Sequence, residues 1–144
     1  MHVKEYFFSE IECYSIILKY YAKLQQAVIG KNQVNKNIRN CRTHMFHDKD
    51  LELRFSDAKV SLQLAEYIVG DHYTWHMDGL NRCQTNIILL NSEFTGGLLE
   101  FRNRPHVELN IGDCVSFSKV ENLEHKVSPV ISGVRYSLVA WCLE

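Results

Sequence analysis

Apolar positions near the N-terminus of the chain recur with the period of an α-helix. Between positions 11 and 24 they fall three or four residues apart, at Ile11, Tyr14, Ile17, Leu18, Tyr21 and Leu24. Ser9, followed three residues later by Glu12, forms a capping-box signature, and Gly30 is the residue type that commonly ends a helix. The pattern predicts an amphipathic helix that follows a short strand over residues 3–8 and covers one face of a sheet.

From Leu51 onward the apolar runs become short, and turn residues such as Gly70-Asp71 and Gly112-Asp113 separate them. The expected strands cover residues 60–69, 72–78, 85–90, 98–101, 107–110, 114–117, 125–130 and 135–143. Many short strands at this spacing indicate a sandwich or barrel. We therefore expect a mainly β fold with a flanking helix.

Residues 31–50 form a polar, basic and Asn-rich segment between these two regions. It predicts a loop near an active-site entrance, with Arg39, Arg42 and Lys49 available to a substrate, although a solvated connection is the simpler alternative. His44 and His47 have no carboxylate partner at a spacing that suits a metal, so we interpret them as loop histidines.

Composition narrows the class of protein. A length of 144 residues fits one domain, with an N-terminal strand and helix over about 3–30, the loop over about 31–50 and a β core over about 51–144. A net charge of −1 argues against an electrostatic grip on nucleic acid or on an anionic membrane.

Cysteine usage and hydropathy indicate the compartment. The five cysteines are odd in number and never form C-x-x-C, which favours reduced thiols over a disulfide framework or a zinc–thiolate cluster. The N-terminus lacks the pattern of a signal peptide, and no apolar run approaches the ~18 residues of a membrane span. We expect a cytoplasmic protein without a membrane segment.

The candidate chemistry lies between positions 76 and 135. His76 and Asp78 form an H-x-D pair, and side chains two apart on a strand point to the same side. With His125, which follows after 46 further residues, they match the two-histidine, one-carboxylate facial triad of non-haem iron oxygenases. Arg135 adds a permanent cation ten residues later, which a simple metal site does not need.

Other metal chemistries fit the sequence less well. His72 and His76 are four apart, as in a helical zinc pair, but Tyr73-Thr74-Trp75 between them favours a strand. A zinc hydrolase could use the two histidines and the carboxylate of the triad. That alternative leaves Arg135 unexplained and finds no Glu at the spacing of a helical zinc motif.

Five motifs occur in order along the second half of the chain. They are H-x-D at 76–78, N-x-x-F-x-G-G at 91–97, G-D at 112–113, H-x-V-x-P at 125–129 and G-x-R-x-S at 133–137. With this set, the chain from about Val3 to its C-terminus resembles prolyl 4-hydroxylase-type Fe(II)/2-oxoglutarate-dependent dioxygenases. The resemblance implies a double-stranded β-helix (jelly roll) core with the N-terminal helix packed outside.

The resemblance also implies a role for each site residue. His76, Asp78 and His125 would hold Fe(II), and Arg135 would bind the distal carboxylate of 2-oxoglutarate through its planar guanidinium. Further cosubstrate contacts would come from Ser137, Tyr67, Thr85 and Leu99, and Tyr73 and Trp141 would lie near the substrate. The alternatives are a structural salt bridge for Arg135 and ordinary core packing for the others.

One of these roles conflicts with simple strand geometry. Strict alternation places Tyr73 on the face opposite His76, so its role requires a kink, expected near Gly70-Asp71. The sequence also departs from the family at Leu89, where some members carry a tyrosine that donates to the distal carboxylate. The segment between the N-terminal helix and Tyr67, a region that often helps to wrap the substrate, is short for the family.

The implied reaction couples oxidative decarboxylation of 2-oxoglutarate, with release of succinate and CO2, to hydroxylation of a C–H bond. Fe(II), 2-oxoglutarate and O2 would take part, with ascorbate as an auxiliary reductant. The expected substrate is a peptide or protein, with a prolyl residue first and a lysyl residue second. A free amino acid or small metabolite and a non-catalytic binding module are the alternatives, and the neutral net charge disfavours a nucleic-acid substrate.

Overall fold

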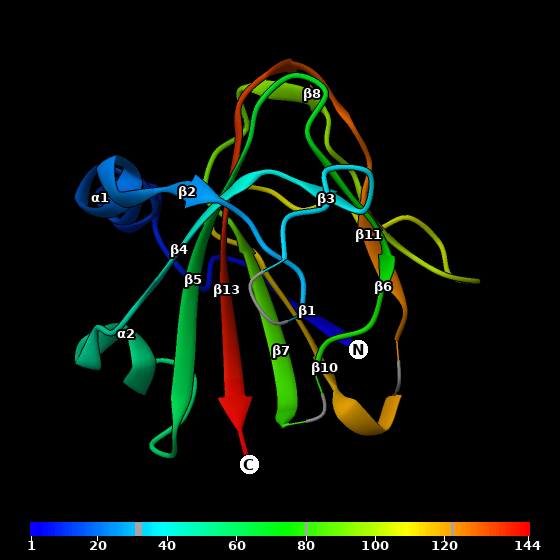
Figure 1. Ribbon diagram of the computed structural model, residues 1–144. Helices are drawn as coiled ribbons and strands as arrows, with labels where there is room; N and C mark the ends of the chain where they lie inside the picture. Colours follow the sequence, from blue (N-terminus) through cyan, green and yellow to red (C-terminus); the bar gives the residue numbers. More distant parts are fainter. Residues whose placement is uncertain (31–32, 80, 122) are drawn as a thin grey trace.

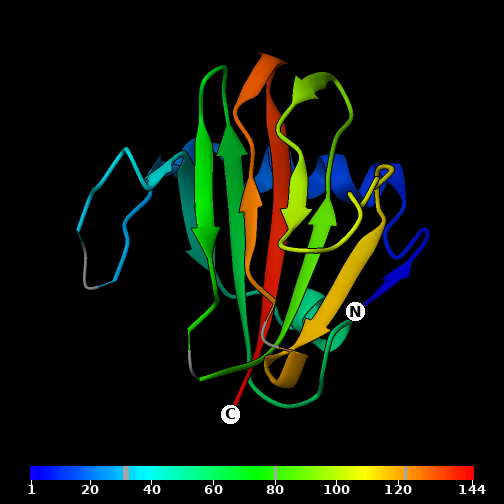
Figure 2. The same ribbon diagram turned by 90° about the vertical axis from the view of Figure 1, so that its right-hand side faces the viewer.

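The chain folds into facing antiparallel sheets, with a helix on the outer side of the larger sheet (Figures 1 and 2). The computed structural model describes residues 1–30, 33–79, 81–121 and 123–144. The mainly β architecture with a flanking helix, expected from the sequence, is confirmed. No helix among the described residues combines the length and apolar character that crossing a membrane requires.

The larger sheet supplies most of the core and one wall of the candidate site. Its strands, in spatial order, are β1 (His2–Lys4), β10 (Cys114–Ser118), β7 (Arg82–Leu89), β13 (Arg135–Leu143), β5 (Val60–Tyr67), β4 (Arg42–Phe46) and β2 (Gln25–Gln26). β13 lies at the centre and pairs with β5 on one side and β7 on the other.

The smaller sheets face this one. The first contains β3 (Arg39–Asn40), β6 (His72–His76), β11 (His125–Val127) and β9 (Leu99–Phe101), and the second pairs β12 (Val130–Gly133) with β8 (Phe94–Gly96). The helical elements are α1 (Glu10–Tyr20), η1 (Tyr21–Lys23), α2 (Lys49–Leu53) and η2 (Lys119–Glu121). Residues 107–110, expected to form a strand, have no regular secondary structure.

Helix α1 begins where the capping box predicts. The Glu12 backbone N–H donates to Ser9 Oγ at 3.1 Å, and the Ser9 N–H donates to Glu12 Oε1 at 3.0 Å. The helix ends at Tyr20 rather than near Gly30, because Leu24 takes an extended backbone that leads into β2. The expected N-terminal strand is likewise shorter, since β1 covers only His2–Lys4.

The buried face of α1 is not the one that the apolar spacing suggests. Cys13, Ile16 and Tyr20 pack into the core. Four of the six expected apolar positions are exposed instead, namely Ile11, Tyr14, Leu18 and Tyr21. Apolar residues occur on both sides of this helix, so their period fits either face, and packing against the sheet decides between them.

The segment expected to be a loop over 31–50 contains β3, β4 and the start of α2, while residues 31–32 lie outside the described residues. β4 extends the larger sheet toward its edge by pairing with β5. On it, Arg42 forms an ion pair with Glu66 at 2.7 Å, and the His44 ring stacks on that of Phe46. Lys49 is exposed on α2. Arg42 and Lys49 are therefore absent from the pocket described below.

The central strand β13 separates two environments. Leu138, Ala140 and Cys142 face the core beneath α1, together with Leu64 of β5 and Ile88 of β7. The alternate side chains face the smaller sheet, where a second apolar cluster surrounds a polar pocket. The period of two along a strand thus separates core residues from pocket residues.

Candidate active site

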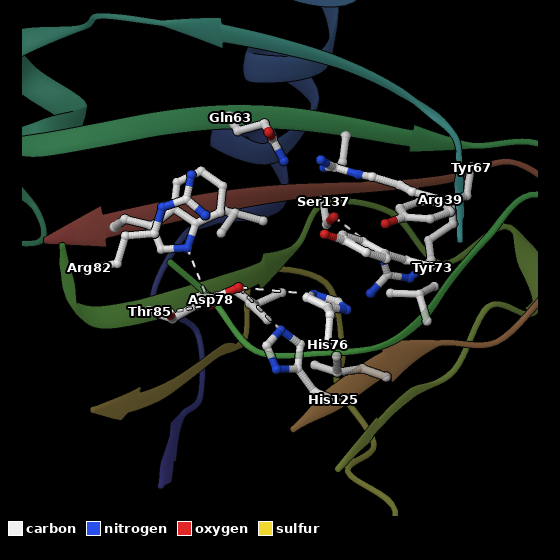
Figure 3. A pocket seen from close by; sticks show the side chains of 17 residues that line it. Arg39, Gln63, Tyr67, Tyr73, His76, Asp78, Arg82, Thr85, His125 and Ser137 are labelled. Atoms are coloured by element: carbon white, nitrogen blue, oxygen red, sulfur yellow. Dashed lines mark hydrogen bonds and ion pairs between the residues drawn. The ribbon is translucent and has the colours of Figure 1, made fainter. Parts of the chain in front are cut away.

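One pocket between the sheets contains all ten residues to which the family resemblance gives a role. His76, Asp78, His125, Arg135, Ser137, Tyr67, Thr85, Leu99, Tyr73 and Trp141 all line it (Figure 3). The central strands β5, β7 and β13 form one wall, while β6, β9 and β11 supply the opposite one.

His76, Asp78 and His125 converge on one point of this pocket. Strand β11 places His125 directly opposite His76 on β6, and Asp78 follows just after β6 ends. Asp78 Oδ1 lies 3.9 Å from His76 Nε2 and 3.6 Å from His125 Nε2, and one donor atom from each residue lies within 4.8 Å of the others. Donors that each lie ~2.0–2.2 Å from a common ion are at most ~4.4 Å apart, and both distances from Asp78 Oδ1 are shorter than that.

Backbone hydrogen bonds orient both imidazoles toward this point. His76 Nδ1 lies 2.7 Å from the Thr74 carbonyl oxygen, and His125 Nδ1 lies 3.0 Å from that of Leu123. Since a carbonyl only accepts, each Nδ1 carries the proton and each Nε2 keeps a lone pair for a metal. Burial, followed by the neighbouring His125, lowers the pKa of His76 to about 4, which keeps its ring neutral.

Two donors from the larger sheet fix the carboxylate of Asp78. Thr85 Oγ1 donates to Asp78 Oδ2 at 2.5 Å, and the Trp141 indole N–H donates to the same oxygen at 3.3 Å. Thr85 and Trp141 lie directly opposite each other on β7 and β13. Because Oδ2 accepts both bonds, Oδ1 stays directed toward the two imidazoles (Figure 3).

Arg135 is a buried cation deep in the same pocket. Its side chain is 2% exposed, and its Nη1 donates to Ser137 Oγ at 3.1 Å. Its Nε has no hydrogen-bond partner, and within the described residues no carboxylate forms an ion pair with it. Burial lowers the pKa of Arg135, but a guanidinium remains protonated. Such a group needs an anion, so the geometry fits a carboxylate ligand.

The N-x-x-F-x-G-G motif fixes the position of Arg135. Asn91 Nδ2 donates to the Val134 carbonyl oxygen at 2.7 Å, and Asn91 Oδ1 accepts from the Tyr136 backbone N–H at 2.8 Å. Gly97 adopts φ +56°, and a Cβ there would lie 3.0 Å from Arg135 Cδ. The motif thus holds both sides of the arginine in place.

Tyr73 reaches the pocket through a β-bulge. Two steps along β11, from His125 to Val127, correspond to three steps along β6, from His76 to Tyr73. The extra residue of β6 puts Tyr73 on the same side as His76, and their rings stack at 3.5 Å. The required irregularity therefore lies at Thr74-Trp75 rather than near Gly70-Asp71.

Tyr67 and Leu99 complete the predicted set. The Tyr67 ring lies 5.4 Å from Arg135 Cζ, and burial raises the pKa of its hydroxyl well above the ordinary value. Leu99 is buried on β9 and lines the pocket beside the arginine. Both residues close the pocket around the guanidinium.

Sequence reasoning missed further pocket residues, above all Gln63 and Arg82, and it only suggested Arg39. Gln63 shares the face of Ala65 and Tyr67 on β5, and this period-two relation could have identified it. Arg82 enters through a second bulge, because one step from Cys142 to Leu143 on β13 corresponds to two steps from Gln84 to Arg82 on β7. No sequence signal marks that extra residue.

Comparisons with known proteins agree with this geometry. The sequence model described as the 2OG-Fe(II) oxygenase superfamily matches residues 62–143, more than half of the chain. The fold and the donor geometry of the site agree with this class of oxygenase. The chain belongs to the 2OG-Fe(II) oxygenase superfamily. No curated protein sequence shows a significant match.

Solved structures show how far the fold extends. A prolyl-4-hydroxylase of Pseudomonas putida has a TM-score of 0.81 at 19% identity, over 99% of this chain and 92% of that one. A Trichoplax adhaerens prolyl hydroxylase, in complex with a hypoxia inducible factor peptide fragment, has a TM-score of 0.80 at 18% identity, over 99% and 82%. A viral collagen prolyl hydroxylase from Paramecium Bursaria Chlorella virus-1 has a TM-score of 0.74 at 20% identity, over 97% of this chain and 93% of that one. At these identities the likeness concerns the fold.

Proposed function

We propose that this oxygenase hydroxylates a C–H bond of a prolyl residue in a peptide or protein, with consumption of 2-oxoglutarate and O2 and release of succinate and CO2. The observation that supports it most is the presence of a three-donor metal site and a buried arginine without a carboxylate partner, among the described residues, in one pocket. A lysyl residue is the second candidate.

In this proposal, His76 Nε2, His125 Nε2 and Asp78 Oδ1 hold Fe(II). The donor set fits because both Nδ1 atoms bond to backbone carbonyls, which leaves the Nε2 atoms for the metal, and because Thr85 and Trp141 fix the carboxylate. The bound metal supplies redox chemistry with O2 and leaves coordination positions open for the cosubstrate. Ascorbate is included in the proposal as the reductant that maintains Fe(II).

Arg135 and Ser137 bind the distal carboxylate of 2-oxoglutarate. The guanidinium offers a planar fork and a free Nε, and the Ser137 hydroxyl lies beside it. Leu89 provides no hydroxyl, so Ser137 supplies the neutral donor. The apolar side chains of Ile87, Val127 and Val139 line the same pocket and help to keep water away from the reacting groups.

The arginine also separates the proposal from a zinc hydrolase. A hydrolase needs the metal and a polarised water, and it gives no role to a fully buried guanidinium on β13. The peptide substrate is supported by the relatives, since the Trichoplax adhaerens enzyme was solved with a peptide fragment.

The test measures succinate formation from 2-oxoglutarate with Fe(II) and ascorbate, together with mass spectrometry for the gain of one oxygen atom in peptide pools. Asp78→Ala and His76→Ala should each lower turnover by more than ~100-fold, because loss of a ligand exceeds the 10–100-fold effect typical of groups that only orient ligands. His47→Ala, which removes an exposed histidine outside the pocket, is the control. Turnover that persists in either ligand variant would contradict the proposed site.

A further inference from the structure

Two cations line the pocket without a role in the proposed chemistry. Arg39 comes from β3 and Arg82 from the start of β7. With Gln63, they lie on the side of the pocket away from His76 and His125 (Figure 3). The pocket lining thus holds three arginines, including Arg135, and a single carboxylate, that of Asp78.

Arg82 is held against an aromatic ring rather than against an acid. Its Cζ lies 3.7 Å from the centroid of the Trp141 ring. Burial lowers the pKa of Arg82, which shows that its charge is partly removed from water. No carboxylate in the described part of the chain forms an ion pair with it, and Asp78 Oδ2 is already engaged by Thr85 and Trp141.

Arg39 has a similar arrangement on the other side. Its Cζ lies 4.6 Å from the centroid of the Tyr73 ring, and its Nη1 donates to the Val28 carbonyl oxygen at 3.0 Å. Its Nε is buried without a hydrogen-bond partner. Across residues 1–30, 33–79, 81–121 and 123–144, no acidic side chain pairs with it. One contact fixes the guanidinium, and part of its donor capacity remains unused.

Each guanidinium is one aromatic ring away from a metal-site residue. The guanidinium of Arg39 lies over the ring of Tyr73, and this ring stacks on that of His76 with the ring planes 7° apart. The guanidinium of Arg82 lies over the ring of Trp141, and the indole N–H of Trp141 donates to Asp78. The two cations therefore flank the point at which a substrate carbon would meet the metal.

The charges of the bound cosubstrate do not satisfy these two arginines. In the proposed function, one carboxylate of 2-oxoglutarate binds Arg135 and the other binds the metal. Arg39 and Arg82 then remain without a counter-charge in a partly desolvated pocket, where an unpaired cation is unfavourable. A second anion would restore the balance.

We propose that the substrate presents a carboxylate next to the carbon that is hydroxylated, and that Arg39 and Arg82 bind this carboxylate. Gln63, whose side chain is 6% exposed, adds a neutral hydrogen-bonding group to the same wall. The inference rests on the proposed function and narrows its substrate. The carboxylate is either the α-carboxylate of a terminal or free residue, or the side chain of a neighbouring Asp or Glu. A lysyl ammonium is disfavoured by the two like charges.

The test compares matched substrates that differ by one carboxylate. The pairs are a peptide with proline flanked by Glu or by Gln, a peptide ending in proline as acid or as amide, and free proline or its amide. For each pair, the two substrates are mixed and their hydroxylation rates are compared. The affinity of each substrate is also measured for the chain loaded with Mn(II) and 2-oxoglutarate. The acid of at least one pair should be preferred by ~10–100-fold, the effect of charge-assisted hydrogen bonds.

Arg39→Gln and Arg82→Gln should each reduce this preference to within a few-fold, whereas Arg104→Gln, an exposed arginine outside the pocket, should retain it. The preference is a ratio within each variant, so partial misfolding does not change it. The inference would be overturned if the acid and neutral substrates of every pair were hydroxylated and bound equally well. It would also be overturned if the preference for the acid persisted in both Arg39→Gln and Arg82→Gln. Absence of succinate formation in the unmodified chain would instead overturn the proposed function, since the affinity measurement does not require turnover.

Discussion

The two faces of the central strand β13 differ in almost every physical respect. Leu138 and Ala140 are completely buried in the apolar cluster beneath α1, and the buried acid on this face, Glu66, is paired with Arg42. On the other face, Arg135 is buried without an acidic partner among the described residues, and Trp141 donates to Asp78. Neighbours in the sequence therefore serve opposite purposes. Apolar burial on one face offsets the unfavourable desolvation on the other.

Consecutive residues of β13 point to opposite faces, so residues that stabilise the fold alternate with residues that line the pocket. A change on the helix side should lower the free energy of unfolding and leave the pocket intact. A change on the pocket side should alter binding and can even stabilise the chain, because functional sites often retain unfavourable groups. The predictions below follow from this separation.

Leu138→Ala should have the largest effect on stability. The side chain is completely buried, and comparable substitutions cost ~2–5 kcal/mol through lost burial and a residual cavity. Urea unfolding followed by circular dichroism measures it. Val139→Ala, the adjacent residue on the pocket side, is the matched control and should cost less while changing 2-oxoglutarate kinetics. Equal losses of stability in the two variants would remove the distinction between the faces.

Arg135→Met should move stability and binding in opposite directions. The KM for 2-oxoglutarate should rise by ~10–100-fold, because charge-assisted hydrogen bonds to the carboxylate are lost. The free energy of unfolding without ligand should rise by ~1 kcal/mol, since a desolvated, unpaired charge is replaced by an apolar chain. Succinate assays and ligand-free urea unfolding measure the two effects. A loss of stability would show that the arginine supports the fold.

Ser9→Ala tests the helix that covers the apolar face. Removal of the hydroxyl that accepts from the Glu12 N–H should cost ~1 kcal/mol. The KM for 2-oxoglutarate should stay the same, because the cap lies outside the pocket. Ser15→Ala, an exposed serine within the same helix, is the control and should leave the free energy of unfolding within ~0.5 kcal/mol. A change in the KM for 2-oxoglutarate would show that the helix cap affects the pocket, which would contradict the separation of the two faces.

Alkaline pH should affect the helix side through two weak acids, the buried thiol of Cys13 and the half-buried hydroxyl of Tyr136. Burial raises the pKa of Cys13 from 9.0 to about 11 and that of Tyr136 from 10.0 to about 12. Above pH 9 the unfolded chain releases protons that the folded chain retains, so stability falls as pH rises. Each group contributes at most ~1.4 kcal/mol per pH unit. Cys13→Ala should flatten the slope in urea unfolding between pH 9 and 11, and an unchanged slope would contradict the assignment.

Much of the pocket could be predicted from the sequence because metal chemistry depends on residue types in a fixed order. His76, Asp78, His125 and Arg135 were identifiable by their donor chemistry and spacing. The strands β5, β7 and β13 were recognisable from runs of apolar and β-branched residues, which suit a buried pleated sheet.

The remaining features depend on contacts that leave no local pattern. β4 pairs with β5 near the edge of the larger sheet. Backbone hydrogen bonds hold it there, while its mostly polar side chains resemble those of a loop. The end of α1 is decided by the turn into β2, and its buried face by packing. Arg82 reaches the pocket because a bulge changes which side of β7 it occupies.

The bulge at Thr74-Trp75 has a consequence for comparing this chain with its relatives. A deletion of one residue there would remove the bulge and place Tyr73 two positions before His76, the spacing at which an ordinary strand keeps both side chains on one face. The Tyr73 ring, and with it the surface against which Arg39 lies, would thus stay on the pocket side despite one gap in an alignment. In a related chain, a tyrosine three positions before the histidine that corresponds to His76 needs such a bulge to face the pocket, whereas a tyrosine two or four positions before it needs none.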